Sequence, residues 1–394
     1  MDARRDEALC AADTHGRRQT DVVVIGGGQA GISLSFHLKR RGIDHVVIER
    51  DRPFSSWASR WDGFRTNTPN WMNTLPMLPP DVFPSDDGSA FASREELLDY
   101  LNRCLAAADP PLELGRDVRR VTQTVSGTWE VDTGDVVFET PAVAICTGAM
   151  STPRIPAAAD EIGAEVVQMH SSEYTSPAQI GTGRVLVVGS ASSGVQIGRL
   201  LAEAGRFREV SMSVSKVMTL PERILGVPTH RFLHRLGLFD VTSTSLLGRI
   251  MYSGLETKGD PIMRPTPKDL SKLLGVRLHG RFMGAENGSL FFDDGRKMTT
   301  DDLTIIWCTG FRSDFGFIEV HDPAAVFADN GSPVHVRGVV DAAEGLYFVG
   351  LRYQHTVASH DIYGVAADAE HVANHISVGT HGQESRTVAT AGRQ

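Results

Sequence analysis

The stretch 21–49 constrains the fold more than any other part of the chain. Its first apolar run, 22–25, is β-branched without alternation, which predicts a strand buried on both faces of a parallel sheet. The motif Gly26-x-Gly28-x-x-Gly31 follows, and a predicted helix over 32–41 and a second predicted strand over 45–48 come next. This order is the context of a dinucleotide-binding turn, and the alternative is an ordinary glycine-rich turn.

Each glycine of this turn has a distinct physical task. The first glycine makes the tight turn, the second lets the backbone approach a pyrophosphate, and the third lets the helix pack on the strand. The phosphates are expected at the helix N-terminus. Glu49 ends the second predicted strand about 20 residues after the first glycine, where a carboxylate can accept hydrogen bonds from a ribose diol.

A second motif of the same kind begins at Gly189. A predicted strand over 184–188 leads into Gly189-Ser190-Ala191-Ser192-Ser193-Gly194, and a predicted helix runs to about residue 204. Ala191 stands where the second glycine is expected, so a phosphate can still come close, though less freely. The next predicted strand, 209–214, ends at Ser215-Lys216 without an acid, which favours NADPH over NADH; alternatively, Lys216 is a solvated surface lysine.

The two motifs belong to an internal repeat. Each half continues into a predicted hairpin (128–139 and 290–297) and a buried strand that ends in Cys-Thr-Gly, at Thr147-Gly148 and at Thr309-Gly310. Two dinucleotide-binding units in one chain usually hold a flavin and a nicotinamide. We therefore expect an α/β fold with two Rossmann-like domains, each a three-layer unit with a parallel sheet and an antiparallel hairpin insert.

The expected domains interleave along the chain. Residues 18–157 and 312–378 are predicted to form a discontinuous FAD-binding domain, into which an NADPH-binding domain, 158–311, is inserted. A late strand over 345–351 and a last helix over 365–376 would return to the first domain. The ends, 1–17 and 379–394, are expected to be disordered. The segment 218–273 is read either as a helical insertion over the active site or as plain surface structure.

Composition excludes several classes of protein. The chain has 394 residues and a formal net charge of −9 without a strong basic run, which argues against nucleic acid as a partner. No apolar run approaches the length of a membrane span. The four cysteines include no CxxC pair, which fits a reducing cytoplasm and predicts neither a metal site nor a redox-active disulfide. A homodimer is left open.

A tryptophan-rich loop, 55–72, follows the first fold unit and predicts a cover over something flat or, alternatively, a packing loop. At this point the chain resembles class B flavin-containing monooxygenases of the short bacterial type, similar to plant YUCCA enzymes. The resemblance spans about residues 20–377. It rests on the paired motifs, on Trp57, Arg60-Trp61 and Thr66-Asn67, on the linker-like 304–311, and on the strand 347–351.

The family signature FxGxxxHxxx(F/Y) is only half present. His170 and Tyr174 have the right spacing, but Ala164 and Val166 replace its Phe and Gly. Baeyer–Villiger relatives carry Trp where Tyr174 stands, so that branch fits less well. His170 is interpreted as a structural link near the nucleotide domain rather than as a catalytic base.

The resemblance implies an FAD- and NADPH-dependent monooxygenase. NADPH would reduce FAD, O₂ would add to give a C4a-hydroperoxyflavin, and this would oxygenate a small soft nucleophile such as an amine or sulfide, or a 2-oxo acid. Asn67 is the residue expected to act in catalysis; alternatively, it only begins a turn before Pro69. The expected cofactor-binding residues are Gly26, Gly28, Gln29, Ala30, Gly31, Glu49, Arg50, Trp57, Arg60, Thr66, Asn67, Thr147, Gly148, Ser190, Ala191, Ser192, Ser193, Gly194, Ser215, Lys216, Thr309, Gly310 and Ile362.

Two other functions stay open. The first is an uncoupled NADPH-dependent flavin oxidase or reductase, which would release hydrogen peroxide or pass electrons to a partner. The second is a non-enzymatic nucleotide-sensing module. That reading needs only one dinucleotide-binding motif and no aromatic loop, so the repeat counts against it.

Overall fold

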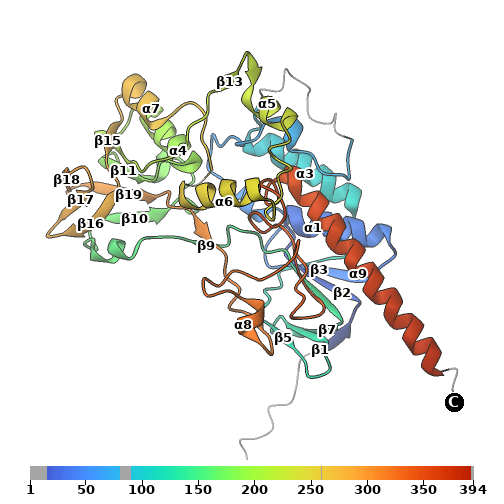
Figure 1. Cartoon of the computed structure of the whole chain (residues 1–394). Helices are drawn as coiled ribbons and strands as arrows, with labels where there is room; N and C mark the ends of the chain where they lie inside the picture. The colour runs from blue at the N-terminus through green and yellow to red at the C-terminus, as the bar shows by residue number, and fades with distance from the viewer. Residues whose placement is uncertain (1–15, 80–89, 259, 392–394) are drawn as a thin grey trace, which may run out of the picture.

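A computed structural model describes residues 16–79, 90–258 and 260–391. Within this part of the chain, two five-stranded parallel sheets form the centres of two units (Figure 1). The first sheet has the order β22-β8-β2-β3-β4. Its strands are β2 (Val22–Ile25), β3 (His45–Glu49), β4 (Leu112–Leu114), β8 (Ala142–Ile145) and β22 (Leu346–Phe348). Every neighbouring pair in this sheet is parallel.

Helices and a second sheet cover the two faces of the first sheet. One face packs against α1 (Gln29–Arg40), α3 (Arg94–Ala108) and α9 (Ile362–Ala391). The other face packs against a mixed sheet, β1-β7-β6-β5-β21. The strands of that sheet are β1 (Gly16–Gln19), β5 (Arg120–Gln123), β6 (Trp129–Asp132), β7 (Val136–Thr140) and β21 (Ile318–Glu319). The first unit therefore has three layers.

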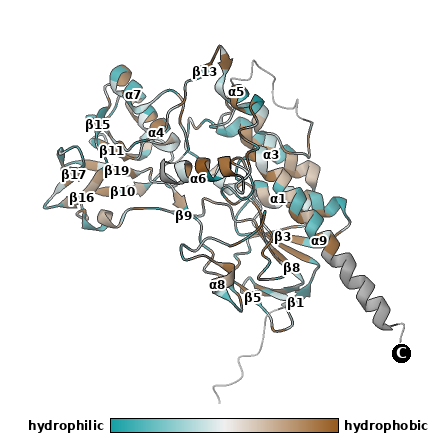
Figure 2. Cartoon of the chain, in the orientation of Figure 1, coloured by the Kyte–Doolittle hydropathy of each residue, from teal (hydrophilic) through white to brown (hydrophobic). Residues whose placement is uncertain are grey.

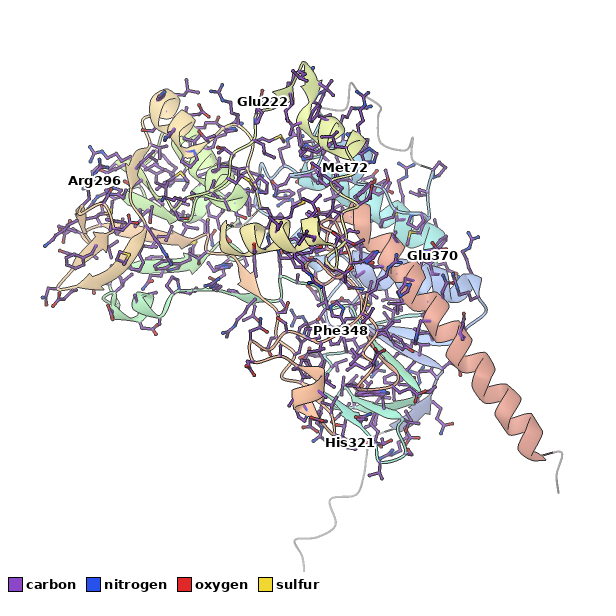
Figure 3. The ribbon with its side chains drawn as sticks, in the orientation of Figure 1. Met72, Glu222, Arg296, His321, Phe348 and Glu370 are labelled. Atoms are coloured by element: carbon purple, nitrogen blue, oxygen red, sulfur yellow. The ribbon has the colours of Figure 1, made fainter. Side chains whose placement is uncertain are left out.

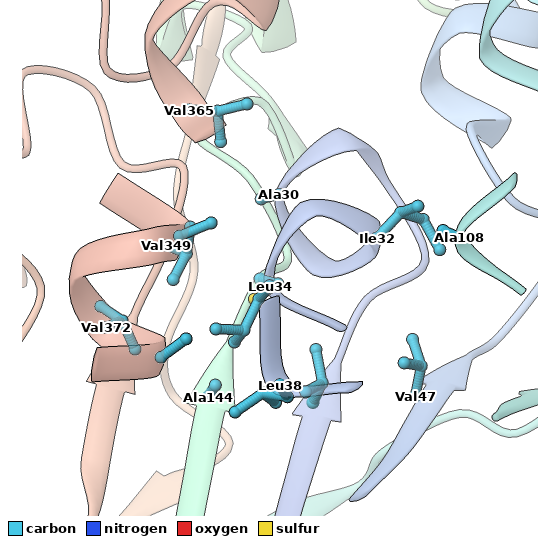
Figure 4. Packing of buried hydrophobic residues seen from close by; sticks show 14 of the residues in the cluster. Ala30, Ile32, Leu34, Leu38, Val47, Ala108, Ala144, Val349, Val365 and Val372 are labelled. Carbon is cyan, nitrogen blue, oxygen red and sulfur yellow. The ribbon is translucent and has the colours of Figure 1, made fainter. Parts of the chain in front are cut away.

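The core of the first unit follows directly from its apolar strands. Val24 and Ala144 are fully buried, and Leu34 and Leu38 of α1 pack in the same cluster. Val372 of α9, the helix that packs beside α1, belongs to the same cluster (Figure 4). Figure 2 shows β3 and β8 in mainly hydrophobic colours, as expected for strands covered on both faces.

The second unit repeats the plan. Its parallel sheet has the order β10-β19-β11-β12-β15. These strands are β10 (Val167–His170), β11 (Arg184–Val188), β12 (Glu209–Ser213), β15 (Arg277–His279) and β19 (Leu303–Trp307). One face packs against α4 (Ser192–Glu203) and α7 (Pro267–Leu274). The other packs against the antiparallel strands β16 (Phe282–Glu286), β17 (Ser289–Phe292) and β18 (Lys297–Thr299).

The chain crosses between the units twice, and the two crossings lie side by side. Strand β9 (Thr152–Pro153) leaves the first unit and pairs antiparallel with β20 (Phe311–Arg312), which leaves the second. After the second crossing, β22 joins β8 of the first sheet and α9 packs on α1. In Figure 3, Phe348 of β22 lies inside the first unit and Arg296 lies at the outer edge of the second.

The segment 218–273 contains a helical insertion. Its regular elements are β13 (Arg223–Ile224), β14 (Val227–Pro228), α5 (Thr229–Arg235) and α6 (Leu246–Lys258), and α7 begins near its end. The remaining short elements are α2 (Ser55–Ala58), η1 (Asn70–Met72), η2 (Ala157–Glu161), η3 (Pro177–Gln179) and α8 (Pro323–Val326). The insertion reaches the last segment of the first unit, where Ser243 N donates to His355 O at 2.7 Å.

Some element boundaries differ from the sequence expectation. Helix α1 begins at Gln29 rather than near residue 32, because the backbone is already helical through Gly31. Helix α9 begins at Ile362 and continues to Ala391, through much of the tail expected to be disordered. Gly16 and Arg17 pair with β7 in a strand, whereas 1–15 and 392–394 lie outside the described residues. Among the described residues, no helix has the length and apolarity to cross a membrane.

Candidate functional site

The first glycine motif forms a tight turn between β2 and α1. Gly26 has a φ of +112°, and a Cβ placed there would lie 2.6 Å from Cys146 O. A Cβ at Gly31 would lie 1.9 Å from Gly26 O, so both glycines are required by backbone packing. Gly28 differs, because a Cβ there meets nothing within 4 Å. The turn therefore leaves open space beside Gly28 at the N-terminus of α1, which Gln29 and Ala30 begin, and an anion fits there.

Glu49 lies at the end of β3 beside this turn. Its carboxylate is buried, with Oε2 accepting from Gly27 N at 2.7 Å and Oε1 accepting from Asp51 N at 3.0 Å. Each oxygen keeps further acceptor capacity, so the carboxylate can also accept from ribose hydroxyls. Arg50 follows with an exposed side chain.

The second motif repeats this geometry. Gly189 has a φ of +125°, and its Cβ would lie 2.2 Å from Cys308 O. A Cβ at Gly194 would lie 2.1 Å from Gly189 O. Ala191 has φ −79° and ψ −175°, close to the φ −81° and ψ −172° of Gly28. An alanine is accommodated because this extended conformation suits any residue. Ser192 and Ser193 begin α4, so the N-terminus of this helix offers backbone N–H groups as that of α1 does.

The ribose position of the second unit carries no acid. Strand pairing aligns Val188 with Ser213, as it aligns Ile25 with Ile48, so Val214 stands where Glu49 stands in the first unit. Ser190 Oγ bridges the turn to the next residue: it accepts from Ser215 N and donates to Ser215 O, both at 3.2 Å. Lys216 is exposed at this edge. Because no carboxylate stands at the position equivalent to Glu49, the Lys216 ammonium suits the 2′-phosphate of NADPH.

The tryptophan-rich loop is bound to the first motif. Trp57 Nε1 donates to Gln29 Oε1 at 2.8 Å, and Gln29 Nε2 donates to His360 O at 2.9 Å. The Arg60 guanidinium lies over the rings of Trp57 and Phe64, 5.8 and 5.9 Å from their centroids. Arg60 Nε is buried without a partner among the described residues, and burial lowers the pKa of Arg60. A buried, unpaired guanidinium N–H fits an anionic ligand such as a pyrophosphate.

The same loop enters the second unit. Trp61 and Phe64 are buried in the core cluster that α4 and β11 supply. Asp62 N donates to Thr175 O at 2.8 Å. A cofactor held at the first motif and a cofactor held at the second would therefore both adjoin one loop.

Three more of the expected cofactor residues have side chains that are already engaged within the protein. Thr66 is buried and its Oγ1 donates to Thr68 O at 2.8 Å. Thr309 Oγ1 donates to Arg154 O. Ile362 is also committed, because its side chain packs in the core of the first unit. The side chains of these residues therefore serve the fold first.

The Thr-Gly pairs lie near the crossings between the units. Gly148 and Gly310 have φ values of +79° and +84°, and a Cβ at either position meets nothing within 4 Å. Gly310 O accepts from Arg154 N at 3.0 Å and from His170 Nε2 at 3.0 Å. Thr147 is half-buried beside Gly148. Open space at both glycines leaves the backbone approachable.

His170 has a structural role in this arrangement. Its Nδ1 accepts from Ser172 N at 3.2 Å while its Nε2 donates to Gly310 O, which fixes one neutral tautomer. Burial lowers the pKa of His170, so the ring stays neutral. Tyr174 is fully buried in the core of the second unit. His170 and Tyr174, the two residues of the family signature that are present, therefore both have structural roles near the crossing between the units.

Sequence reasoning missed an aromatic cluster that the insertion forms beside the first unit. His234 of α5 lies with its ring 5.0 Å from that of Trp71, and its Nε2 is 2.9 Å from Tyr363 OH, at the start of α9. Phe239 lies 6.4 Å from the Tyr363 ring. No local pattern pointed to this cluster, because its members come from three distant segments.

The described cysteines and acids form neither a redox pair nor a metal site. Cys104, Cys146 and Cys308 are free and buried, and Cys10 lies outside the described residues. Burial raises the pKa of each of these three thiols, which keeps them protonated. Among the described residues, no group of His, Cys, Asp or Glu is arranged to hold a metal ion.

Comparisons with known proteins agree with this geometry. A family model described as pyridine nucleotide-disulphide oxidoreductase matches residues 23–219. An uncharacterized CzcO-like oxidoreductase of Geobacillus kaustophilus is 31% identical over 358 residues, which cover 90% of this chain and 98% of the relative. The indole-3-pyruvate monooxygenase YUCCA1 of Oryza sativa is 28% identical over 393 residues, covering 91% and 93%.

A solved structure shares the fold. The flavin-containing monooxygenase from Stenotrophomonas maltophilia superposes with a TM-score of 0.70 at 22% identity, and the match covers 92% of this chain and 99% of that one.

Proposed function

The chain belongs to the pyridine nucleotide-disulphide oxidoreductase family and is similar to flavin-containing monooxygenases within it. We propose that it is an FAD- and NADPH-dependent monooxygenase. The proposed substrate is a small soft nucleophile, an amine or a sulfide, or a 2-oxo acid. The observation that carries the proposal is the loop 57–67, because it contacts both units. Its Trp57 is hydrogen-bonded to Gln29 beside the first dinucleotide turn, and its Trp61 and Phe64 are buried in the core of the second unit.

The proposed FAD site is the first turn. The backbone beside Gly28 and the N-terminus of α1 would bind the pyrophosphate, and Glu49 would accept from the adenosine ribose. Arg60 would supply a cation to the phosphates through its unpaired Nε–H. Bound FAD would supply hydride acceptance and oxygen activation, and the protein would supply orientation and exclusion of water.

The proposed NADPH site is the second turn, 189–194. Its backbone N–H groups would hold the pyrophosphate, and Ser215 with Lys216 would contact the 2′-phosphate. Asn67 is the proposed catalytic residue, since its amide can donate and accept without titrating. The proposed domains remain 18–157 with 312–378 for FAD and 158–311 for NADPH. The homodimer and the cytoplasmic location stay predictions from the sequence.

Disulfide reduction fits this chain poorly despite the family's name. That chemistry needs two thiols close together with at least one in thiolate form. The sequence has no CxxC pair, and the described cysteines are buried thiols with raised pKa values. An uncoupled flavin oxidase remains the second candidate, because Asn67 is exposed and a hydroperoxyflavin that water can reach releases hydrogen peroxide.

One screen tests the proposal. The purified protein is expected to be yellow and to consume NADPH faster than NADH. NADPH consumption is followed across amines, sulfides and 2-oxo acids, with hydrogen peroxide and oxygenated product measured in parallel. Stoichiometric product with little peroxide supports the monooxygenase, whereas peroxide equal to NADPH for every substrate supports the oxidase. A colourless protein without bound flavin would contradict both.

A further inference from the structure

Gln196 joins the two units through its side-chain amide. It lies in the second turn of α4, the helix that begins at the second dinucleotide turn. Its Oε1 accepts from Arg65 N at 3.1 Å, and its Nε2 donates to Arg65 O at 2.9 Å and to Asn67 Oδ1 at 3.3 Å. One glutamine therefore ties the segment that carries Asn67 to the helix of the second unit.

The Arg65 backbone fixes which way the Gln196 amide points. A backbone N–H can only donate and a carbonyl can only accept, so the amide oxygen must face the former and the NH₂ group must face the latter. The second hydrogen of that NH₂ group then faces Asn67, whose oxygen must be the acceptor. The NH₂ group of Asn67 is consequently left to donate elsewhere.

The residues that flank Asn67 are fixed by their contacts with both units. Trp61 and Phe64 are buried in the core of the second unit, and Thr66 N donates to Ala92 O at 2.9 Å in the first. Asn67 itself is exposed, and Gln196 is its one side-chain partner among the contacts of the described residues. Its orientation therefore depends on Gln196.

We propose that Gln196 is a positioning residue for Asn67: it presents the Asn67 NH₂ group as a donor toward the flavin and fixes that donor relative to the nicotinamide-binding helix. This rests on the proposed function of Asn67. The proposal makes Asn67 a donor rather than an acceptor at the reacting site, which its amide chemistry alone leaves undecided.

Hydrogen exchange of single amides tests the contact without reference to turnover. In the flavin-loaded protein, Gln196→Ala removes the acceptor of Arg65 N, so exchange at that amide should accelerate about 2- to 10-fold, as expected for one hydrogen bond. Exchange at Thr66, whose partner is Ala92 O, should not change and serves as an internal control. Arg199→Ala is the matched control on the same helix, because Arg199 pairs with Glu203 instead.

Gln196→Glu tests whether Gln196 orients the Asn67 amide or only supports the loop. A carboxylate still accepts from Arg65 N, but it cannot donate to Arg65 O, which it faces with an acceptor oxygen, so exchange at Arg65 should rise by no more than in Gln196→Ala. It also brings an oxygen to Asn67 Oδ1, and the Asn67 amide should turn its NH₂ group away from the flavin. Hydrogen peroxide released per NADPH consumed should rise about 5- to 10-fold. In an Asn67→Ala background, the same substitution should release no additional hydrogen peroxide.

The outcomes are distinct. Unchanged Arg65 exchange in Gln196→Ala overturns the contact, and wild-type coupling in Gln196→Glu overturns the positioning role. The positioning role is also overturned if Gln196→Glu increases hydrogen peroxide release equally in the wild type and in Asn67→Ala, because Gln196 would then act independently of Asn67. If Asn67→Ala alone couples like wild type, the proposed role of Asn67 fails and positioning fails with it, while the Arg65 exchange still measures the contact.

Discussion

Substituting two glycines of the first turn should separate cofactor binding from folding. Gly28 has an extended backbone and open space where a Cβ would lie. Gly28→Val should therefore fold, at a cost of about 1 kcal/mol for a poor N-cap residue. Its branched side chain fills the space through which a pyrophosphate approaches. Losing one charge-assisted backbone hydrogen bond of about 1.5–3 kcal/mol weakens FAD binding about ten- to hundredfold.

Gly31→Ala is the matched substitution in the same turn. The added Cβ would lie 1.9 Å from Gly26 O, whereas real Cβ atoms stay beyond 3.0 Å. The carbonyl cannot retreat easily, because Gly26 N is itself bonded to Ile48 O at 2.8 Å. We expect a loss of several kcal/mol of stability, seen as a lower Tm or insoluble protein.

Two measurements decide between these effects. Flavin content per protein by absorbance reports binding, and thermal unfolding of the flavin-free protein reports stability. Gly28→Val should lose flavin and keep its Tm within a few degrees, whereas Gly31→Ala should lose Tm. Full flavin content in Gly28→Val, or wild-type stability in Gly31→Ala, would refute the reasoning about the turn.

Two further predictions concern Lys216 and His230. Lys216→Ala should raise the KM for NADPH about ten- to hundredfold and leave that for NADH unchanged, and an unaltered preference would show that another residue reads the phosphate. Burial lowers the pKa of His230 to about 4. The unfolded chain then binds the extra proton below about pH 6.5, so stability should fall by roughly 2–3 kcal/mol between pH 6.5 and 4; in His230→Phe, equilibrium unfolding across that range should lose this slope.

Local patterns predicted the two turns and their flanking elements well. The need for Gly26 and Gly31 is a matter of backbone geometry within one turn, so it is visible in the sequence. The N-terminus of α3 is equally local, because Ser93 and Glu96, three residues apart, form a capping box there. The two expected hairpins are confirmed for the same reason, because each pairs strands that are close in the chain.

The contacts that assemble the site were not predictable in this way. Gln196 occupies an ordinary polar position on α4, and only the long-range placement of Arg65 gives it a partner. The insertion was equally hard to interpret, because His234 meets Trp71 and Tyr363 from segments far apart in the chain. Glycine spacing records a local constraint, whereas these contacts depend on how the two units meet.

The most direct test of the account compares wild type with Asn67→Leu. A leucine of similar size can neither donate nor accept, while the two dinucleotide turns stay intact. The variant should keep its flavin and still oxidise NADPH, but should release hydrogen peroxide in place of oxygenated product. If product per NADPH in Asn67→Leu equals that of wild type, Asn67 is structural and the monooxygenase proposal loses its catalytic residue.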